Sequence, residues 1–72
     1  MSEDVLVDLP PSAKLVHTVL EHEGPLTQGA IATHSRLSPR TVRHATAILE
    51  EHEVVHAEPY QEDRRRSVYR LR

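Results

Sequence analysis

The chain has 72 residues, a formal net charge of −2 and no cysteine. This length accommodates one small domain, and the lack of cysteine excludes disulfides and thiolate metal sites. No segment approaches the ~20 apolar residues that cross a bilayer, and the N-terminus lacks the basic start of a signal peptide, so the expected location is cytoplasmic. Residues 1–26 carry five acids and one lysine, whereas residues 27–72 carry eight arginines and six acids. The basic charge is therefore concentrated in the second part of the chain.

The first predicted helix follows residues 1–9, which form an N-terminal tail or a short strand; residues 10–72 form one domain. Two prolines and Ser12 open this helix, because proline suits a first helical turn and Ser12 can cap backbone N–H groups. Gly24 ends the helix as a left-handed cap, before a proline that cannot continue it. The apolar residues at helical spacing are Ala13, Val16, Val19 and Leu20.

The next segment predicts two helices joined by a short turn. Leu26 is a single strand residue, and Thr27 caps a helix that runs from Gln28 to about Thr33. A third helix starts at Ser38-Pro39, a cap residue followed by proline at the first helical position, and it ends near His52. Its buried stripe consists of Val42, Ala45, Ile48 and Leu49.

Two β-prone segments follow the third helix. The first covers Val54 to Glu58 and is expected to stop at Pro59, and the second covers Ser67 to Leu71. The charged residues from Tyr60 to Arg66 are expected to form the loop of a hairpin. The predicted fold is therefore α+β, mainly α: a winged helix-turn-helix with three helices followed by a two-stranded β wing.

The exposed polar residues of this layout predict a DNA contact. The second helix of a helix-turn-helix enters the major groove, and its N-terminal residues meet base edges. Residues at helix starts present N–H groups to phosphates. Adjacent arginines at a hairpin tip repel one another unless a phosphate backbone or a minor groove receives them. The predicted DNA-binding residues are Thr27, Gln28, Ser38, Arg40, Thr41, Arg43, His44, Arg64, Arg65 and Arg66.

Other chemistry finds no support in the sequence. The chain has six histidines, but no pair combines the His-x-x-x-His spacing on one helix with a third ligand, so no metal site is predicted. Surface positions are expected for these histidines, with His44 on the DNA-reading face. There is no glycine-rich phosphate loop and no histidine–serine–carboxylate grouping, so an enzyme is not expected, nor is a cofactor.

Four short segments together resemble the winged-helix core of MarR-type transcriptional regulators, over about residues 26–71. They are Leu26-Thr27-Gln28, Leu37 to Val42, Leu49-Glu50-Glu51 and Glu62 to Val68. The resemblance implies a recognition helix at residues 38–52 and a wing at residues 54–71, with residues 59–67 against the DNA backbone or minor groove.

The resemblance also implies a role for one wing arginine. In the family an Asp-x-Arg in the wing places its arginine in the minor groove. The matching residue is Arg65 when counted from Asp63, and Arg66 when counted back from Ser67-Val68, because the chain has an extra residue here.

The chain departs from the family pattern in three ways. The long helices that form the family's dimer are not represented in residues 1–25 or after the wing. Without them the family's effector pocket has no walls, so no small-molecule effector is expected. Glu53 replaces the glycine expected after the recognition helix, and a left-handed conformation at this residue costs ~1 kcal/mol or more.

These observations predict sequence-specific binding of double-stranded DNA and regulation of transcription. Palindromic sites suit two-fold proteins, so a homodimer is expected, with Val5, Val7, Leu9 and uncovered parts of the first helix as its interface. No membrane contact is expected. The alternative is a winged-helix protein–protein interaction module in a transcription-related assembly, with the acidic first third of the chain as its interaction surface.

Overall fold

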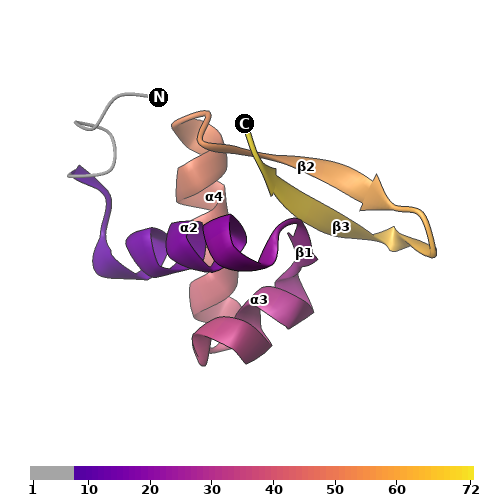
Figure 1. Ribbon diagram of the computed structural model, residues 1–72, viewed down its shortest axis with the longest axis horizontal. Helices are drawn as coiled ribbons and strands as arrows, with labels where there is room; N and C mark the ends of the chain where they lie inside the picture. Colours follow the sequence, from indigo (N-terminus) through magenta and orange to yellow (C-terminus); the bar gives the residue numbers. More distant parts are fainter. Residues whose placement is uncertain (1–7) are drawn as a thin grey trace.

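The computed structural model describes residues 8–72 (Figure 1). They form three helices, α2 (Pro11–Glu23), α3 (Gln28–Ser35) and α4 (Pro39–Glu51), and a three-stranded antiparallel sheet of β1 (Leu26–Thr27), β2 (Val55–Tyr60) and β3 (Asp63–Leu71). The predicted order of three helices followed by a wing is confirmed. The wing, formed by β2 and β3, projects to one side of the helical part (Figure 1). Of the residues predicted for the dimer interface, Val5 and Val7 lie outside the described range. Leu9 is buried in the domain's own core, with 4% of its surface exposed.

Helix α2, Pro11–Glu23, begins as predicted with a proline in its first turn. Its N-cap is Pro10, whose side chain makes no capping hydrogen bond. The prediction that Ser12 caps the helix is therefore wrong. Gly24 ends α2 with a positive φ of 81°, and its N–H donates to the Leu20 carbonyl over 3.0 Å. A surface position was expected for His17, but this side chain is buried on α2, with Nδ1 3.6 Å from a carboxylate oxygen of Glu21.

Helices α3, Gln28–Ser35, and α4, Pro39–Glu51, form the predicted helix-turn-helix. Both predicted caps are present: the Ala30 N–H donates to the Thr27 hydroxyl, and the Thr41 N–H donates to the Ser38 hydroxyl, each over 3.2 Å. α3 is longer than predicted and ends at Ser35; its C-cap, Arg36, is left-handed with φ 62° and ψ 18°.

The sheet contains one strand more than the predicted wing. β1, Leu26–Thr27, pairs with β3, Asp63–Leu71, which also pairs with β2, Val55–Tyr60. β1 therefore attaches the wing to the start of α3, through the pairs Leu26–Tyr69 and Thr27–Val68. The sequence predicts Leu26 as a single strand residue but does not indicate its partner, because that partner lies more than forty residues further along the chain.

Two expectations about the wing are wrong. Pro59 does not stop the first strand, because β2 is an edge strand, where a residue without an N–H is tolerated. The segment from Tyr60 to Arg66 is not a long loop: Tyr60 pairs with Asp63, so only Gln61 and Glu62 form the turn. Pro59 pairs with Ser67, which leaves the residues Arg64, Arg65 and Arg66 without partners on β2, in a bulge beside the tip.

The hydrophobic core lies where the three helices meet the inner part of the sheet. Ile31, Val42 and Leu49 are fully buried, and Val55 and Tyr69 extend the core to β2 and β3. The predicted stripe of α4 is thus confirmed, with Ile48 only partly buried against it. This packing fixes α4 and the base of the wing relative to each other.

Glu53, between α4 and β2, has a left-handed backbone conformation with φ 59°. This is the conformation that costs free energy in a residue other than glycine. Replacing Glu53 with glycine is expected to raise the free energy of unfolding by about 0.5–1 kcal/mol, because glycine reaches this conformation without a Cβ clash. In a domain of this size the melting temperature should rise by about 4 °C.

The matched control for this prediction is Glu50→Gly, the same change on the exposed side of α4. It should lower stability by about 1 kcal/mol, because glycine is unfavourable inside a helix. Thermal unfolding followed by circular dichroism measures both variants. A melting temperature that falls in Glu53→Gly would contradict the argument from backbone strain.

Candidate nucleic-acid interface

The N-terminal half of α4 presents two arginines and a histidine to solvent. Arg40, Arg43 and His44 are exposed, as the sequence predicts. Ser38 and Thr41 are tied to each other, because the Ser38 hydroxyl donates to the Thr41 hydroxyl over 2.9 Å while accepting the Thr41 N–H. This capping pair holds the first turn of α4 in place beside the exposed arginines.

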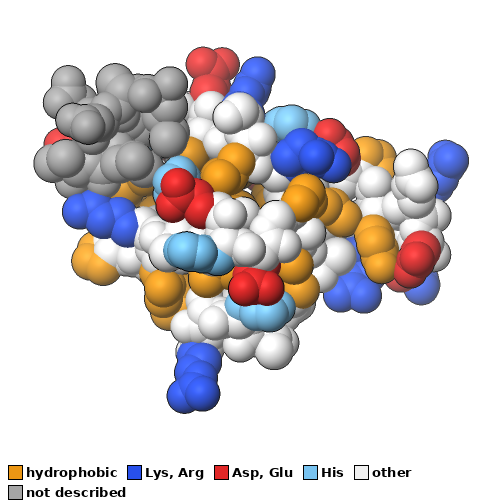
Figure 2. All heavy atoms as spheres, viewed as in Figure 1, with side chains coloured by type: hydrophobic (Ala, Val, Ile, Leu, Met, Phe, Trp, Pro, Cys, Tyr) orange, Lys and Arg blue, Asp and Glu red, His pale blue; other side chains and the backbone are white. Residues whose placement is uncertain are grey.

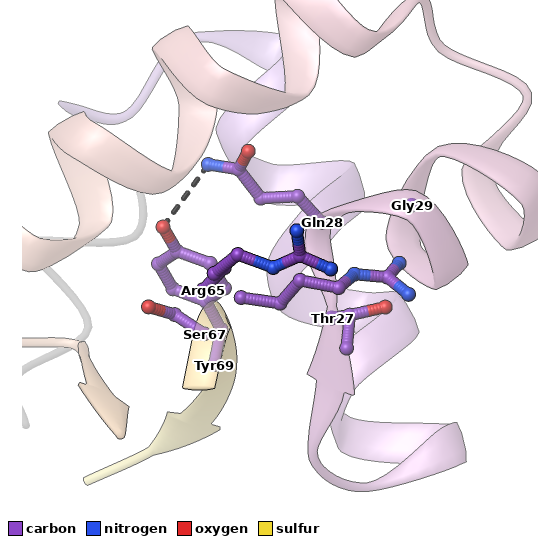
Figure 3. A pocket seen from close by; sticks show the side chains of 7 residues that line it. Thr27, Gln28, Gly29, Arg65, Ser67 and Tyr69 are labelled. Carbon is purple, nitrogen blue, oxygen red and sulfur yellow. Dashed lines mark hydrogen bonds between the residues drawn. The ribbon is translucent and has the colours of Figure 1, made fainter. Parts of the chain in front are cut away.

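Gln28 lies at the start of α3, but its side chain turns into the domain. The amide Nε2 donates to the Tyr69 hydroxyl over 3.0 Å (Figure 3). It also donates to the Thr46 hydroxyl over 3.4 Å. These bonds join α3, α4 and β3, a role that sequence reasoning missed. The side-chain nitrogen of Gln28, a predicted DNA-binding residue, is therefore engaged within the domain.

The three wing arginines have different surroundings. Arg65 is held by Asp63, whose carboxylate accepts the Arg65 backbone N–H over 3.1 Å and the side-chain Nε over 3.2 Å. The Arg65 side chain remains 91% exposed. Arg64 lines a separate hollow with Glu58, Pro59 and Gln61. Asp63 and Arg65 thus form a hydrogen-bonded pair two residues apart.

A hollow of about 330 Å³ separates the wing from the beginning of α3, and Arg65 reaches across it from β3 (Figure 3). Backbone N–H groups of a first helical turn have no partners within the helix and attract anions. Two arginines therefore face the end of α3 that carries partial positive charge. The lining residues are Thr27, Gln28, Gly29, Arg65, Arg66, Ser67 and Tyr69.

The charge distribution separates this side of the domain from the rest. No acidic residue occurs between Glu23 and Glu50, a stretch that contains the whole helix-turn-helix up to the last turn of α4 and includes Arg36, Arg40 and Arg43. Figure 2 shows acidic, histidine and basic side chains on the face turned to the viewer, and further basic side chains that project from the lower edge and, beside an acidic one, from the outer end of the wing. The net negative charge of the chain thus resides away from the helix-turn-helix.

The ion pair of the wing has a measurable signature. The hydrogen bond from the Arg65 side chain, followed by that from its backbone N–H, lowers the pKa of the Asp63 carboxyl. Because the folded-state pKa is the lower one, the carboxylate stabilises the fold above its unfolded pKa of about 4 and loses this contribution as the pH falls through the folded pKa. We expect an NMR titration of Asp63 to give a midpoint below about 4.

The control variants assign this shift to Arg65. Arg65→Ala should move the Asp63 midpoint up toward the ordinary aspartate value, whereas Arg64→Ala should leave it almost unchanged, because no hydrogen bond joins Arg64 to this carboxylate in the described wing. An Asp63 midpoint that is the same in wild type and Arg65→Ala would show that the pair does not form in solution.

Within residues 8–72, no group of three or more histidine, cysteine, aspartate or glutamate side chains is arranged to hold a metal ion. No helix in the same range is long and apolar enough to cross a membrane.

The helix-turn-helix and its wing define a winged-helix domain, and comparison with known proteins identifies the family. The MarR family model matches residues 12–67, so the chain belongs to the MarR family, which consists of non-enzymatic transcriptional regulators. No significant match is found among curated proteins.

Solved structures agree with this assignment. YusO from Bacillus subtilis superimposes with a TM-score of 0.84 at 23% identity, covering 89% of this chain and 45% of its own. PcaV from Streptomyces coelicolor gives 0.85 at 22%, covering 90% and 46%. AbfR, solved bound to DNA, gives 0.82 at 30%, covering 97% and 52%. The chain spans about half the length of the structures it matches.

Proposed function

We propose that this chain binds double-stranded DNA sequence-specifically and regulates transcription. In this proposal α4 enters the major groove, and residues 59–67 of the wing contact the adjacent backbone or minor groove. The observation that carries it is the placement of Arg40 and Arg43 on the exposed start of α4, within the stretch between Glu23 and Glu50 that contains no acidic residue. Arginine makes bidentate contacts to guanine, worth ~1–3 kcal/mol of discrimination each.

A relative solved on DNA supports the proposal of DNA binding. AbfR is 30% identical to this chain in an alignment that covers 97% of this chain and 52% of AbfR, and its structure was solved bound to DNA. Within the proposal, Thr27, Ser38, Thr41 and the backbone of Gln28 hold phosphates at helix starts, and His44 lies on the reading face. In this proposal the protein acts in the cytoplasm. It binds as a homodimer, because a single module of this kind buries only ~600–1,000 Å² of protein surface on DNA.

Selection from a pool of random duplexes tests the proposal. We expect the protein to enrich a sequence with two inverted half-sites, about one helical turn or 10 base pairs apart, as a two-fold dimer requires. Arg40→Ala/Arg43→Ala should bind the enriched duplex about 10- to 100-fold more weakly, and random duplex with a much smaller loss, because base contacts carry specificity.

Lys14→Ala is the control, since Lys14 lies on α2, outside the proposed interface; it should keep the wild-type preference. A protein that enriches no sequence and binds no duplex at low salt would refute DNA binding and favour the interaction-module alternative. Enrichment of single half-sites by a protein that remains monomeric in light scattering would refute the homodimer alone.

A further inference from the structure

The wing carries three adjacent arginines, and each of them has its own contacts. Arg64 shares a hollow with Glu58, and Arg65 is bonded to Asp63. Arg66 instead lies against the first turn of α3, so close that a Cβ added to Gly29 would be 3.2 Å from its Nη2. A contact of this length is tighter than ordinary van der Waals contact, so the side chain of Arg66 uses the space that glycine leaves.

The backbone does not explain why residue 29 is glycine. Gly29 lies inside α3 and, unlike Gly24, has no positive φ. Glycine lowers the stability of a helix relative to alanine, so this position carries a cost that the helix itself does not require. The guanidinium end of Arg66 lies in the space that a side chain at this position would enter.

The hollow between Arg66 and α3 suits an anion. Arg65 and Arg66 both line it together with the hydroxyls of Thr27 and Ser67, and none of its described lining residues is acidic. The nearby carboxylate of Asp63 already accepts hydrogen bonds from Arg65. Two guanidinium groups that share one hollow repel each other unless a negative group lies between them.

We propose that Gly29 is a positioning residue that seats Arg66 beside α3, and that Arg66 there contacts one phosphate of the DNA backbone where it passes between the helix-turn-helix and the wing. This inference rests on the proposed function. It gives the two arginines different supports: Asp63 orients Arg65, whereas Gly29 leaves room for Arg66, which holds the backbone at the junction of wing and helix.

A double-mutant cycle tests this coupling by fluorescence anisotropy with a random-sequence duplex, titrated with salt. Arg66→Ala should bind about tenfold more weakly, with a salt slope shallower by about one, as loss of one phosphate contact predicts. Gly29→Ala should weaken binding several-fold in the wild-type and Arg64→Ala backgrounds, but should have no further effect in the Arg66→Ala background. The melting temperature of Gly29→Ala should not fall, because alanine favours the helix. Unfolding of this variant therefore cannot explain its weaker DNA binding.

Three outcomes are decisive. Gly29→Ala with wild-type affinity would overturn the inference, as would a loss that persists in full when Arg66 is already alanine. Both of these results leave the proposed function intact, because the wild type still binds DNA. If the wild type itself binds no duplex at any salt concentration, the proposed function fails and this inference fails with it.

Discussion

Replacement of Arg64, Arg65 and Arg66 together by alanine is expected to weaken binding to duplex DNA by about 100-fold. Each exposed contact with a phosphate contributes about 1 kcal/mol, and 1.4 kcal/mol corresponds to a factor of ten. The salt slope should become shallower by about two to three, because fewer counterions are released when fewer phosphates are neutralised. The fold should remain, since all three side chains are exposed and lie in a bulge without partners on β2.

A variant with the same change of net charge separates position from charge. Lys14, Arg70 and Arg72 are exposed cations outside the bulge, and their joint replacement by alanine also removes three positive charges. Anisotropy at several salt concentrations should show a loss several-fold smaller than that of the wing variant. Equal losses in the two variants would mean that the wing acts only through the overall field of the protein.

Leu49→Ala is expected to have the largest effect on stability. Leu49 is fully buried in the middle of the core, and loss of a buried leucine side chain costs about 3 kcal/mol through lost burial and the cavity left behind. A chain of this length has a total stability of only about 4–11 kcal/mol. The melting temperature should therefore fall by about 15 °C, and DNA binding should be lost once the domain unfolds.

Leu15→Ala provides the control with identical chemistry, because Leu15 is 40% exposed on α2. Its cost should stay below about 1 kcal/mol, since most surface substitutions have small effects. Urea unfolding monitored by circular dichroism measures both variants. Similar losses in the two would show that α4 does not pack in solution as the structure describes.

The helical part of this fold could be predicted from sequence because its signals are local. Ser38 and Pro39 mark the start of α4 within two residues, and the apolar spacing of Val42, Ala45 and Leu49 defines its buried face. The wing was harder to predict, since the strand pairing depends on contacts between distant residues. Nothing near Pro59 indicates that it lies on an edge strand, where proline is compatible with pairing.

The candidate site shows the same division between local and distant signals. The exposed arginines of α4 follow from its periodicity, and a basic wing follows from three adjacent arginines. The assignment of separate surroundings to Arg65 and Arg66 depends on Asp63 in one case and on Gly29, more than thirty residues away, in the other. The position of Gln28 at a helix start favours an exposed side chain, yet its amide donates a hydrogen bond to the Tyr69 hydroxyl inside the domain. No local sequence pattern indicates this hydrogen bond.

The hydrogen bonds of Gln28 have a consequence for the rate and heat of binding. Since one amide joins α3, α4 and β3, the spacing between the recognition helix and the wing is already set in the free protein. For the DNA binding proposed above, we therefore expect no coupled folding step and no large negative heat capacity change of the kind that such a step produces. We expect association to be limited by diffusion and orientation and accelerated by electrostatic steering, because the conformational entropy of ordering these elements is lost when the domain folds.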